Sequence, residues 1–99
     1  MPVTSALTSD GSELNIVLSG RFDFSTQLPC RQAYERTGAK PARFNIDMGE
    51  VSYLDQSALG MLLVLRDHAG SAAVQLANCS AEIRGALQRA NFERLFNIS

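Results

Sequence analysis

Apolar and polar residues alternate over residues 14–19 and again over residues 44–48. Alternation with a period of two predicts strands that have one face in a core. Residues 9–12 have the composition of a turn, so residues 2–8 are expected to pair with the strand at 14–19 as a hairpin. A short and almost wholly apolar run at 73–77 is typical of a strand that lies inside a sheet, between parallel neighbours.

The apolar period changes to three or four residues in other stretches, which predicts helices. The first helix is expected over residues 28–37, after a cap at Ser25 or Thr26. Leu28, Ala33 and Tyr34 are expected to be partly buried on this helix. Gly38 is expected to follow its end, because glycine is a common helix terminator.

A second helix is expected over residues 56–68, after Gly49 and Glu50 have ended the preceding strand. Ser80 is a favourable cap for a third helix, and Asn91 is a favourable left-handed stop for it. The order is strand, strand, helix, strand, helix, strand, helix and an apolar tail. It predicts an α/β fold, with a mixed sheet of four or five strands and helices packed mainly on one face.

The second predicted helix is unusually apolar, and its surface divides into stripes at spacings of three and four residues. Two stripes that share Leu62 can face the sheet, one of them with Leu63 and Arg66, the other with Leu65. A helix on a small sheet cannot bury everything that remains, so a third stripe is expected at the surface. That stripe contains Ser57, Gly60, Met61, Val64 and His68.

The start of this helix places a hydroxyl beside a carboxylate. Asp55 and Ser57 are of the residue types that cap helices, because their oxygens accept bonds from unpaired backbone N–H groups. The segment Asp55-Gln56-Ser57-Ala58-Leu59-Gly60 resembles the central motif of the STAS domain, the fold of bacterial anti-sigma-factor antagonists. In that motif a strand is followed by Asp-Ser-Ser-Gly-Leu-Gly at a helix start. Here Gln56 replaces the first Ser, and Ala58 replaces a Gly.

A second segment supports the resemblance independently. Gly20, Phe22 and Asp23 match the Gly-x-apolar-Asp segment that leads, in this family, from the first long strand into the first helix. The resemblance covers nearly the whole chain, and it implies that residues 1–99 form a single STAS domain with a STAS-like sheet.

The resemblance also implies a role for Ser57, which falls on the serine that a partner kinase phosphorylates in this family. A phosphate adds about two negative charges and three strong acceptor oxygens. The amino end of a helix favours an anion, so the domain is expected to remain folded, whereas a partly apolar contact with a partner would not tolerate the charge. Partner contacts are expected from Asp23, Asp55, Gln56, Gly60, Met61 and Val64.

Each of these residue types also has a purely structural explanation. Ser57 and Asp55 could serve only as helix caps, and Asp23 as a solvated turn residue. Met61 and Val64 could be ordinary core residues. A bare cap at Ser57 leaves the neighbouring apolar stripe unexplained, and this favours a switch.

The family resemblance implies particular partners. The unmodified protein is expected to bind an anti-sigma factor, often itself a Ser kinase of the ATP-binding histidine-kinase-like fold, and so to free a sigma factor. Phosphorylation turns this binding off, and a PP2C-type phosphatase restores it. The alternative is a cytoplasmic STAS subunit of an ABC-type lipid transport complex, which would dock permanently on its ATPase, with Ser57 only as a cap.

Composition argues against several other functions. The formal net charge is -1, so no basic excess exists to hold a nucleic-acid backbone. The longest apolar run, residues 61–65, is far shorter than the ~20 residues that cross a bilayer. With no apolar signal segment at its start, the protein is expected to be cytoplasmic and not inserted in a membrane.

Catalysis, a metal site and a cofactor are not expected. His68 is the only histidine, and along a helix it would lie roughly 16 Å from Ser57, too far to act as its base. Cys30 and Cys79 lack the close spacing of a metal or redox pair, and they are expected to be buried thiols.

Overall fold

The computed structural model describes residues 3–35 and 40–99, so the end expected for the first helix at Thr37 and Gly38 lies outside the described residues. Its strands are β1 (Val3–Leu7), β2 (Glu13–Phe22), β3 (Arg43–Leu54), β4 (Ala73–Ala77) and β5 (Asn97–Ile98). Its α-helices are α1 (Gln27–Glu35), α2 (Gln56–Ala69) and α3 (Ala81–Arg89). The short 3-10 helix η1 (Phe24–Thr26) leads from β2 into α1, and η2 (Phe92–Arg94) lies between α3 and β5. Within the described residues, no helix combines the length and the hydropathy needed to cross a membrane.

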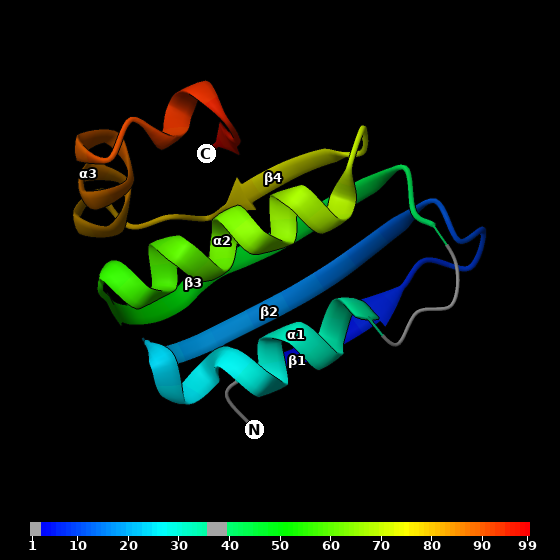
Figure 1. Cartoon of the computed structure of the whole chain (residues 1–99), viewed down its shortest axis with the longest axis horizontal. Coiled ribbons are helices and arrows are strands. Elements are labelled where there is room, and N and C mark those ends of the chain that lie inside the picture. Colours follow the sequence, from blue (N-terminus) through cyan, green and yellow to red (C-terminus); the bar gives the residue numbers. More distant parts are fainter. Residues whose placement is uncertain (1–2, 36–39) are drawn as a thin grey trace.

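The described strands form one mixed sheet of five strands in the order β1-β2-β3-β4-β5. β1 pairs with β2 in the antiparallel direction, as the predicted hairpin requires, and the later neighbours pair in parallel. α1 and α2 lie next to each other over one face of the sheet, α1 over β1 and β2, and α2 over β3 and β4 (Figure 1). The predicted α/β fold with a mixed sheet is therefore confirmed.

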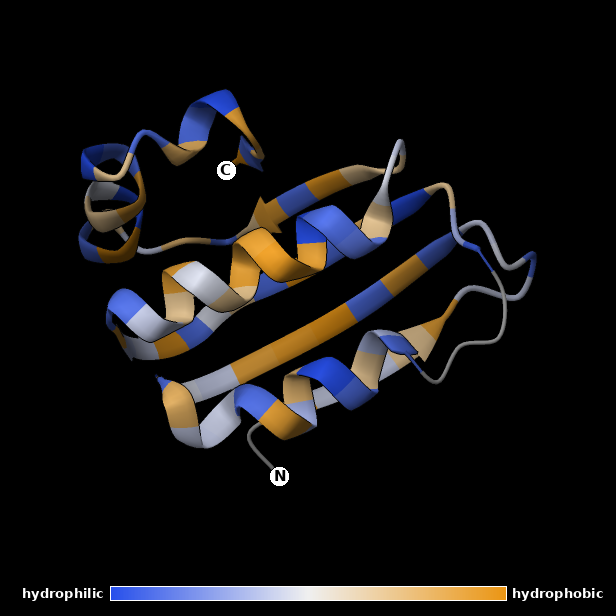
Figure 2. Cartoon of the chain, viewed as in Figure 1, coloured by the Kyte–Doolittle hydropathy of each residue, from blue (hydrophilic) through white to orange (hydrophobic). Residues whose placement is uncertain are grey.

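The core lies between that face and the two helices. Alternate residues of β2 and β3 are apolar and buried. The ribbon of β2, which is visible between α1 and α2, is largely orange (Figure 2). From α2 the side chains of Ala58, Leu62 and Leu65 are fully buried. Leu63 remains 43% exposed and Arg66 is also exposed, so the predicted stripe that contains them does not face the sheet. Leu65 and Leu63 cannot both face the sheet, because each requires a different rotation of α2 about its axis. In the structure Leu65 faces the core and Leu63 faces solvent.

The expectation that Gly49 and Glu50 end a strand is wrong, because β3 continues through them to Leu54. The pairing of β3 with β2 is irregular at this point: Val17 is opposite Asp47, but Ser19 is opposite Glu50. β3 therefore contains an extra residue here, and a bulge of this kind interrupts the ladder without ending the strand. The continuation matters for function because it carries β3 to the same end of the sheet as β2.

The C-terminal tail closes the other edge of the sheet. Asn91 has a left-handed backbone with φ of 62°, as predicted for the stop after α3. Phe92 and Phe96 are buried and stack with ring centroids 5.4 Å apart. The Ser99 backbone N–H donates to the Leu76 carbonyl at 2.9 Å, which holds the short β5 against β4.

Candidate functional site

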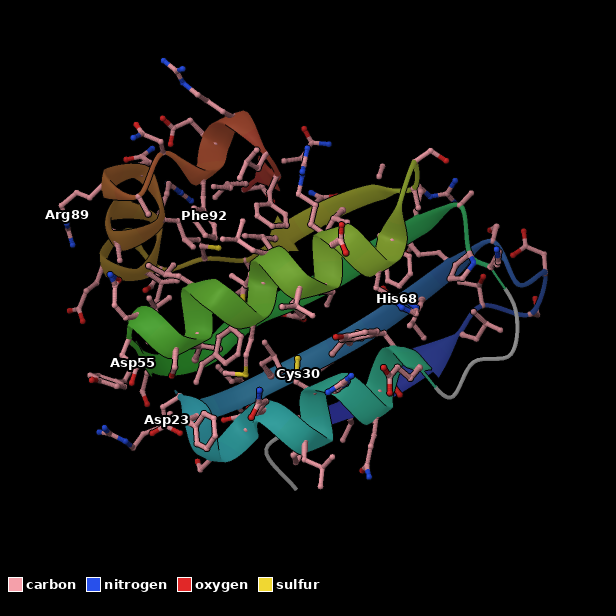
Figure 3. The ribbon with its side chains drawn as sticks, in the orientation of Figure 1. Asp23, Cys30, Asp55, His68, Arg89 and Phe92 are labelled. Carbon is pink, nitrogen blue, oxygen red and sulfur yellow. The ribbon has the colours of Figure 1, made fainter. Side chains whose placement is uncertain are left out.

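Two strand-to-helix junctions meet at one end of the sheet. β2 and β3 are parallel neighbours, and their last residues, Phe22 and Leu54, are opposite each other in the register. The residue that follows each of these strands is an aspartate, so Asp23 and Asp55 lie on adjacent loops. Figure 3 shows both at this end of the molecule, where α1 and α2 begin. The register of the sheet therefore brings together two residues that are 32 positions apart in the sequence (55 − 23).

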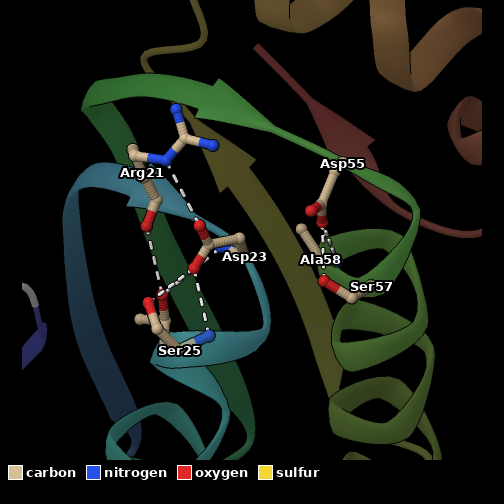
Figure 4. A network of polar contacts seen from close by, with 7 residues as sticks. Arg21, Asp23, Ser25, Asp55, Ser57 and Ala58 are labelled. Carbon is tan, nitrogen blue, oxygen red and sulfur yellow. Dashed lines mark hydrogen bonds and ion pairs between the residues drawn. The ribbon is translucent and has the colours of Figure 1, made fainter.

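Asp55 is the N-cap of α2, as the sequence predicts. Its backbone is extended, and its carboxylate accepts the Ala58 backbone N–H at 3.1 Å. The same oxygen, Oδ1, accepts the Ser57 hydroxyl at 2.6 Å (Figure 4). The hydrogen bond from Ser57 is the largest cause of a lowered pKa for Asp55, so the carboxylate is ionised at neutral pH. Ser57 is thus held in a defined orientation by a charged acceptor.

Ser57 is partly buried and lines a groove of about 510 Å³ between α1 and α2. From α2 the groove is lined by Ser57, Gly60, Met61 and Val64, and from η1 and α1 by Phe24, Gln27, Cys30, Arg31 and Tyr34. The α2 residues are those of the predicted surface stripe, except His68. The structure therefore places the phosphorylation candidate at one end of the groove and the predicted contacts Met61 and Val64 along it.

The groove has an apolar rim that is open to solvent. Phe24 is 68% exposed and Val64 is 57% exposed, whereas Met61 is partly buried beside them. Gly60 is exposed, and an added Cβ there would meet no atom within 4 Å, so the surface of α2 one turn after Ser57 is open. Gln56 is also exposed, at the first turn of α2. Exposed apolar side chains gathered at one place are typical of a binding surface.

Sequence reasoning did not find the α1 side of this groove, and its expectation for Leu28 is wrong. Leu28 is 62% exposed, whereas Cys30 and Tyr34 are buried. Residues four apart lie on one face of a helix, so the pair Cys30 and Tyr34 defines the inner face and Leu28 lies outside it. The predictions for Ala33, which is partly buried, and for Tyr34 are confirmed, and the spacing of Tyr34 from Cys30 is the signal that could have located the inner face of α1.

The cap before α1 also differs from expectation. Asp23, and not Ser25 or Thr26, is the N-cap of η1: its carboxylate accepts the Ser25 backbone N–H at 3.0 Å and the Ser25 hydroxyl at 2.5 Å. Thr26 completes a reciprocal capping box, because its buried hydroxyl accepts the Asp23 backbone N–H and donates to the Arg21 carbonyl. Ser25 supplies the largest cause of the lowered pKa of Asp23.

Arg21 links the two junctions. Its guanidinium pairs with Asp23 at 3.3 Å and lies 4.0 Å from the centre of the Tyr53 ring, on β3. Figure 4 shows the contacts of Asp23 with Arg21 and Ser25 on one side and the pair of Asp55 and Ser57 on the other. The carboxylate of Asp23 therefore accepts hydrogen bonds from three groups, the Ser25 N–H, the Ser25 hydroxyl and the Arg21 guanidinium. The carboxylate of Asp55 accepts two, from the Ala58 N–H and the Ser57 hydroxyl.

The one histidine of the chain does not lie beside Ser57. His68 lies toward the far end of α2 (Figure 3), with its ring centroid 4.8 Å from that of Tyr34. In the described part of the chain, no three His, Cys, Asp or Glu side chains come together in a way that could hold a metal ion. Cys30 and Cys79 are buried free thiols, and burial raises both pKa values, that of Cys30 to about 11.

Comparison with known proteins adds the family. A family model described as Mlab, STAS domain matches residues 5–97. A STAS-domain containing protein of Pseudomonas aeruginosa (strain UCBPP-PA14) is 52% identical over 101 residues, and the match covers 100% of both chains.

Two solved structures are similar in fold. The anti-sigma factor antagonist SpoIIAA in its unphosphorylated form has a TM-score of 0.80 and 16% identity, with 98% of this chain and 87% of that chain covered. A sulfate transporter family protein from Wolinella succinogenes has a TM-score of 0.80 and 18% identity, with 94% of this chain and 79% of that chain covered. Together with the family model and the 52% identical relative, these likenesses agree with the motif that the sequence carries at residues 55–60. The chain belongs to the STAS domain family.

Proposed function

We propose that this protein is a partner-switching regulator of the anti-sigma-factor-antagonist type. Unmodified, it binds an anti-sigma factor or a related Ser kinase of the histidine-kinase-like ATPase fold. Phosphorylation of Ser57 by that kinase, with ATP as donor, ends the binding, and a PP2C-type phosphatase restores it. The observation that carries the proposal is the position of the Ser57 hydroxyl, which is held by Asp55 at one end of a groove with an open apolar rim.

The electrostatics of the site support a switch that leaves the fold intact. A phosphate on Ser57 would lie in the first turn of a 14-residue helix, where backbone N–H groups and the helix dipole favour negative charge. The same charge would enter any interface that buries Val64 and Met61, and an unpaired charge in such an interface is costly. Phosphorylation is therefore expected to remove the partner without unfolding the domain.

The chain offers a matched control for this proposal. Ser25 is an exposed serine at the neighbouring junction, and its hydroxyl also donates to a capping aspartate. Intact-mass analysis with site mapping, on protein purified from its native cells, is expected to find one phosphate on Ser57. The Ser57→Ala variant should carry none, whereas Ser25→Ala should be modified like the wild type.

Partner capture provides the functional measurement. Ser57→Ala is expected to retain the kinase or anti-sigma factor constitutively, and Ser57→Asp to retain much less. Ser25→Ala and Ser25→Asp should both bind like the wild type. A phosphate mapped to another residue, or equal capture by all Ser57 variants, would contradict the proposal.

The second candidate function is a STAS subunit that docks permanently on the ATPase of a lipid transport complex. This candidate is supported by the likeness in fold to a sulfate transporter family protein, because it shows the same fold in a protein of a transporter family. Ser57 would then serve only as part of the α2 start. Stable co-purification of an ATPase subunit, equally strong with Ser57→Ala and Ser57→Asp, would support this function over the first.

A further inference from the structure

One cation lines the same groove as Ser57. Arg31 is on the α1 side, and among the described residues around this groove no other Lys or Arg is present. Gln27, one helical turn before Arg31, lines the same groove, so the two residues lie on one face of α1. No anionic residue of α2 lines the groove beside this positive charge.

In the unmodified protein Arg31 is paired with Glu35, one turn further along the same helix. The Nε–H group of Arg31 donates to Glu35 at 3.0 Å, and this hydrogen bond raises the pKa of Arg31. Both side chains are largely in solvent, with 58% and 47% of their area exposed. Exposed pairs of this spacing contribute little to stability, so the guanidinium can leave Glu35 at small cost.

Gly60 lines the groove together with Arg31 and Ser57. Gly60 lies one turn after Ser57 on the same face of α2, and the space that a Cβ would occupy there is empty. Arg31 carries a long side chain with a planar fork of donors, which matches the oxygens of a phosphate in pairs. A phosphate on Ser57 would also be repelled by Asp55 and Asp23, which lie at the outer end of the site. That repulsion directs the phosphate toward the groove.

We propose that Arg31 is the internal acceptor for a phosphate on Ser57. On modification, its guanidinium exchanges Glu35 for the phosphate and closes an ion pair across the groove, above Gly60. This inference rests on the proposed phosphorylation of Ser57 and extends it. The modified state would then differ from the unmodified one in shape as well as in charge, because the pair covers the part of the groove next to Met61.

The test installs phosphoserine at position 57 during translation, so that it needs neither the kinase nor any partner. The second pKa of the phosphoserine, ordinarily about 6, is followed by ³¹P NMR in the full-length protein. It is expected to be lower in the wild type than in Arg31→Gln by about half a unit, which is roughly a threefold change in proton affinity. Arg89→Gln, which removes a positive charge from the surface of α3, should leave the value unchanged (Figure 3).

Glu35 distinguishes a direct ion pair from a general effect of charge. Glu35→Gln frees Arg31 from its competitor, so the phosphate pKa should fall further. In the double variant Arg31→Gln, Glu35→Gln this additional fall should disappear, because coupled residues are not additive. Equal phosphate pKa values in the wild type and Arg31→Gln would overturn the inference, as would a Glu35 effect that persists without Arg31. Neither result would bear on whether a kinase modifies Ser57 in the cell, which is measured by the mass analysis above.

Discussion

The two strand-to-helix junctions of this protein have almost the same local sequence and different roles. Each consists of an aspartate, one intervening residue and a serine, and in each the serine hydroxyl donates to the capping carboxylate. At the β2 end the next residue is Thr26, which returns a bond to the Asp23 backbone and another to Arg21. At the β3 end the next residue is Ala58, which can return none.

This difference separates a structural corner from the candidate site. The Asp23 junction is closed by reciprocal bonds and by the ion pair with Arg21, so its polar groups are already occupied. At the Asp55 junction, the described side-chain hydrogen bond of Ser57 is the one to Asp55, and Ser57 also lines the groove. Exposure does not distinguish the two serines in favour of Ser57, because Ser25 is exposed and Ser57 is partly buried. Ser57 differs in lining the groove, and the tripeptide alone does not determine that.

The largest expected effect comes from breaking the reciprocal bonds at the closed junction. Thr26 is only 2% exposed, and Val has nearly its shape without its hydroxyl. Thr26→Val is expected to lower the free energy of unfolding by about 1–3 kcal/mol, because the Asp23 N–H and the Arg21 carbonyl lose their partner. Urea unfolding measures this loss. Ser25→Ala, at an exposed position of the same turn, should cost much less, and equal losses would show that the reciprocal bonds are unimportant.

A smaller effect is expected from removing either cap. Asp23→Ala and Asp55→Ala should each lower the thermal midpoint by a few degrees, since each leaves backbone N–H groups of a helix start without an acceptor. The two should differ in a second measurement. Loss of Asp55 frees the Ser57 hydroxyl and is expected to slow its phosphorylation, whereas loss of Asp23 should not. The same slowing in both variants would mean that the junctions act as one unit.

The smallest effect is a pH dependence that compares the two carboxylates directly. Both pKa values are lowered from the ordinary 3.8, so the stability that these groups contribute is complete above that pH and is lost as pH falls through the lower folded-state values. In a carboxyl NMR titration, Ser57→Ala should raise the pKa of Asp55 and leave that of Asp23 nearly unchanged. Ser25→Ala should do the reverse. A pKa at or above 3.8 for either group in the wild type would contradict the hydrogen bonds described here.

The errors of the sequence predictions have identifiable physical causes. Gly49 and Glu50 have the composition of a strand end, yet β3 passes through them, because pairing with the long neighbour β2 outweighs the weak local preference. Leu28 is apolar but exposed, because the face of α1 that packs inward is set by Cys30 and Tyr34. In both cases a tertiary contact overrides a local signal.

The features that the sequence predicted correctly are those with a strong local cause. Asp55 caps α2 because the acceptor lies three residues before the N–H that it satisfies, and Asn91 stops α3 because asparagine tolerates a left-handed backbone. The alternation in β2 and β3 identifies their buried faces for the same reason, since each side chain's direction follows from its position in the strand.

By itself, the sequence determined the order of the elements, the mixed sheet, the family and the hydroxyl at the start of α2. Only the tertiary structure decided that Asp23 lies beside Asp55, that Arg31 faces the groove with Ser57, and that Phe24 forms its rim. The reason is physical. Periodicity and capping are properties of neighbouring residues, whereas the register of parallel strands and the rotation of two helices on a sheet depend on contacts between residues that are distant in the chain.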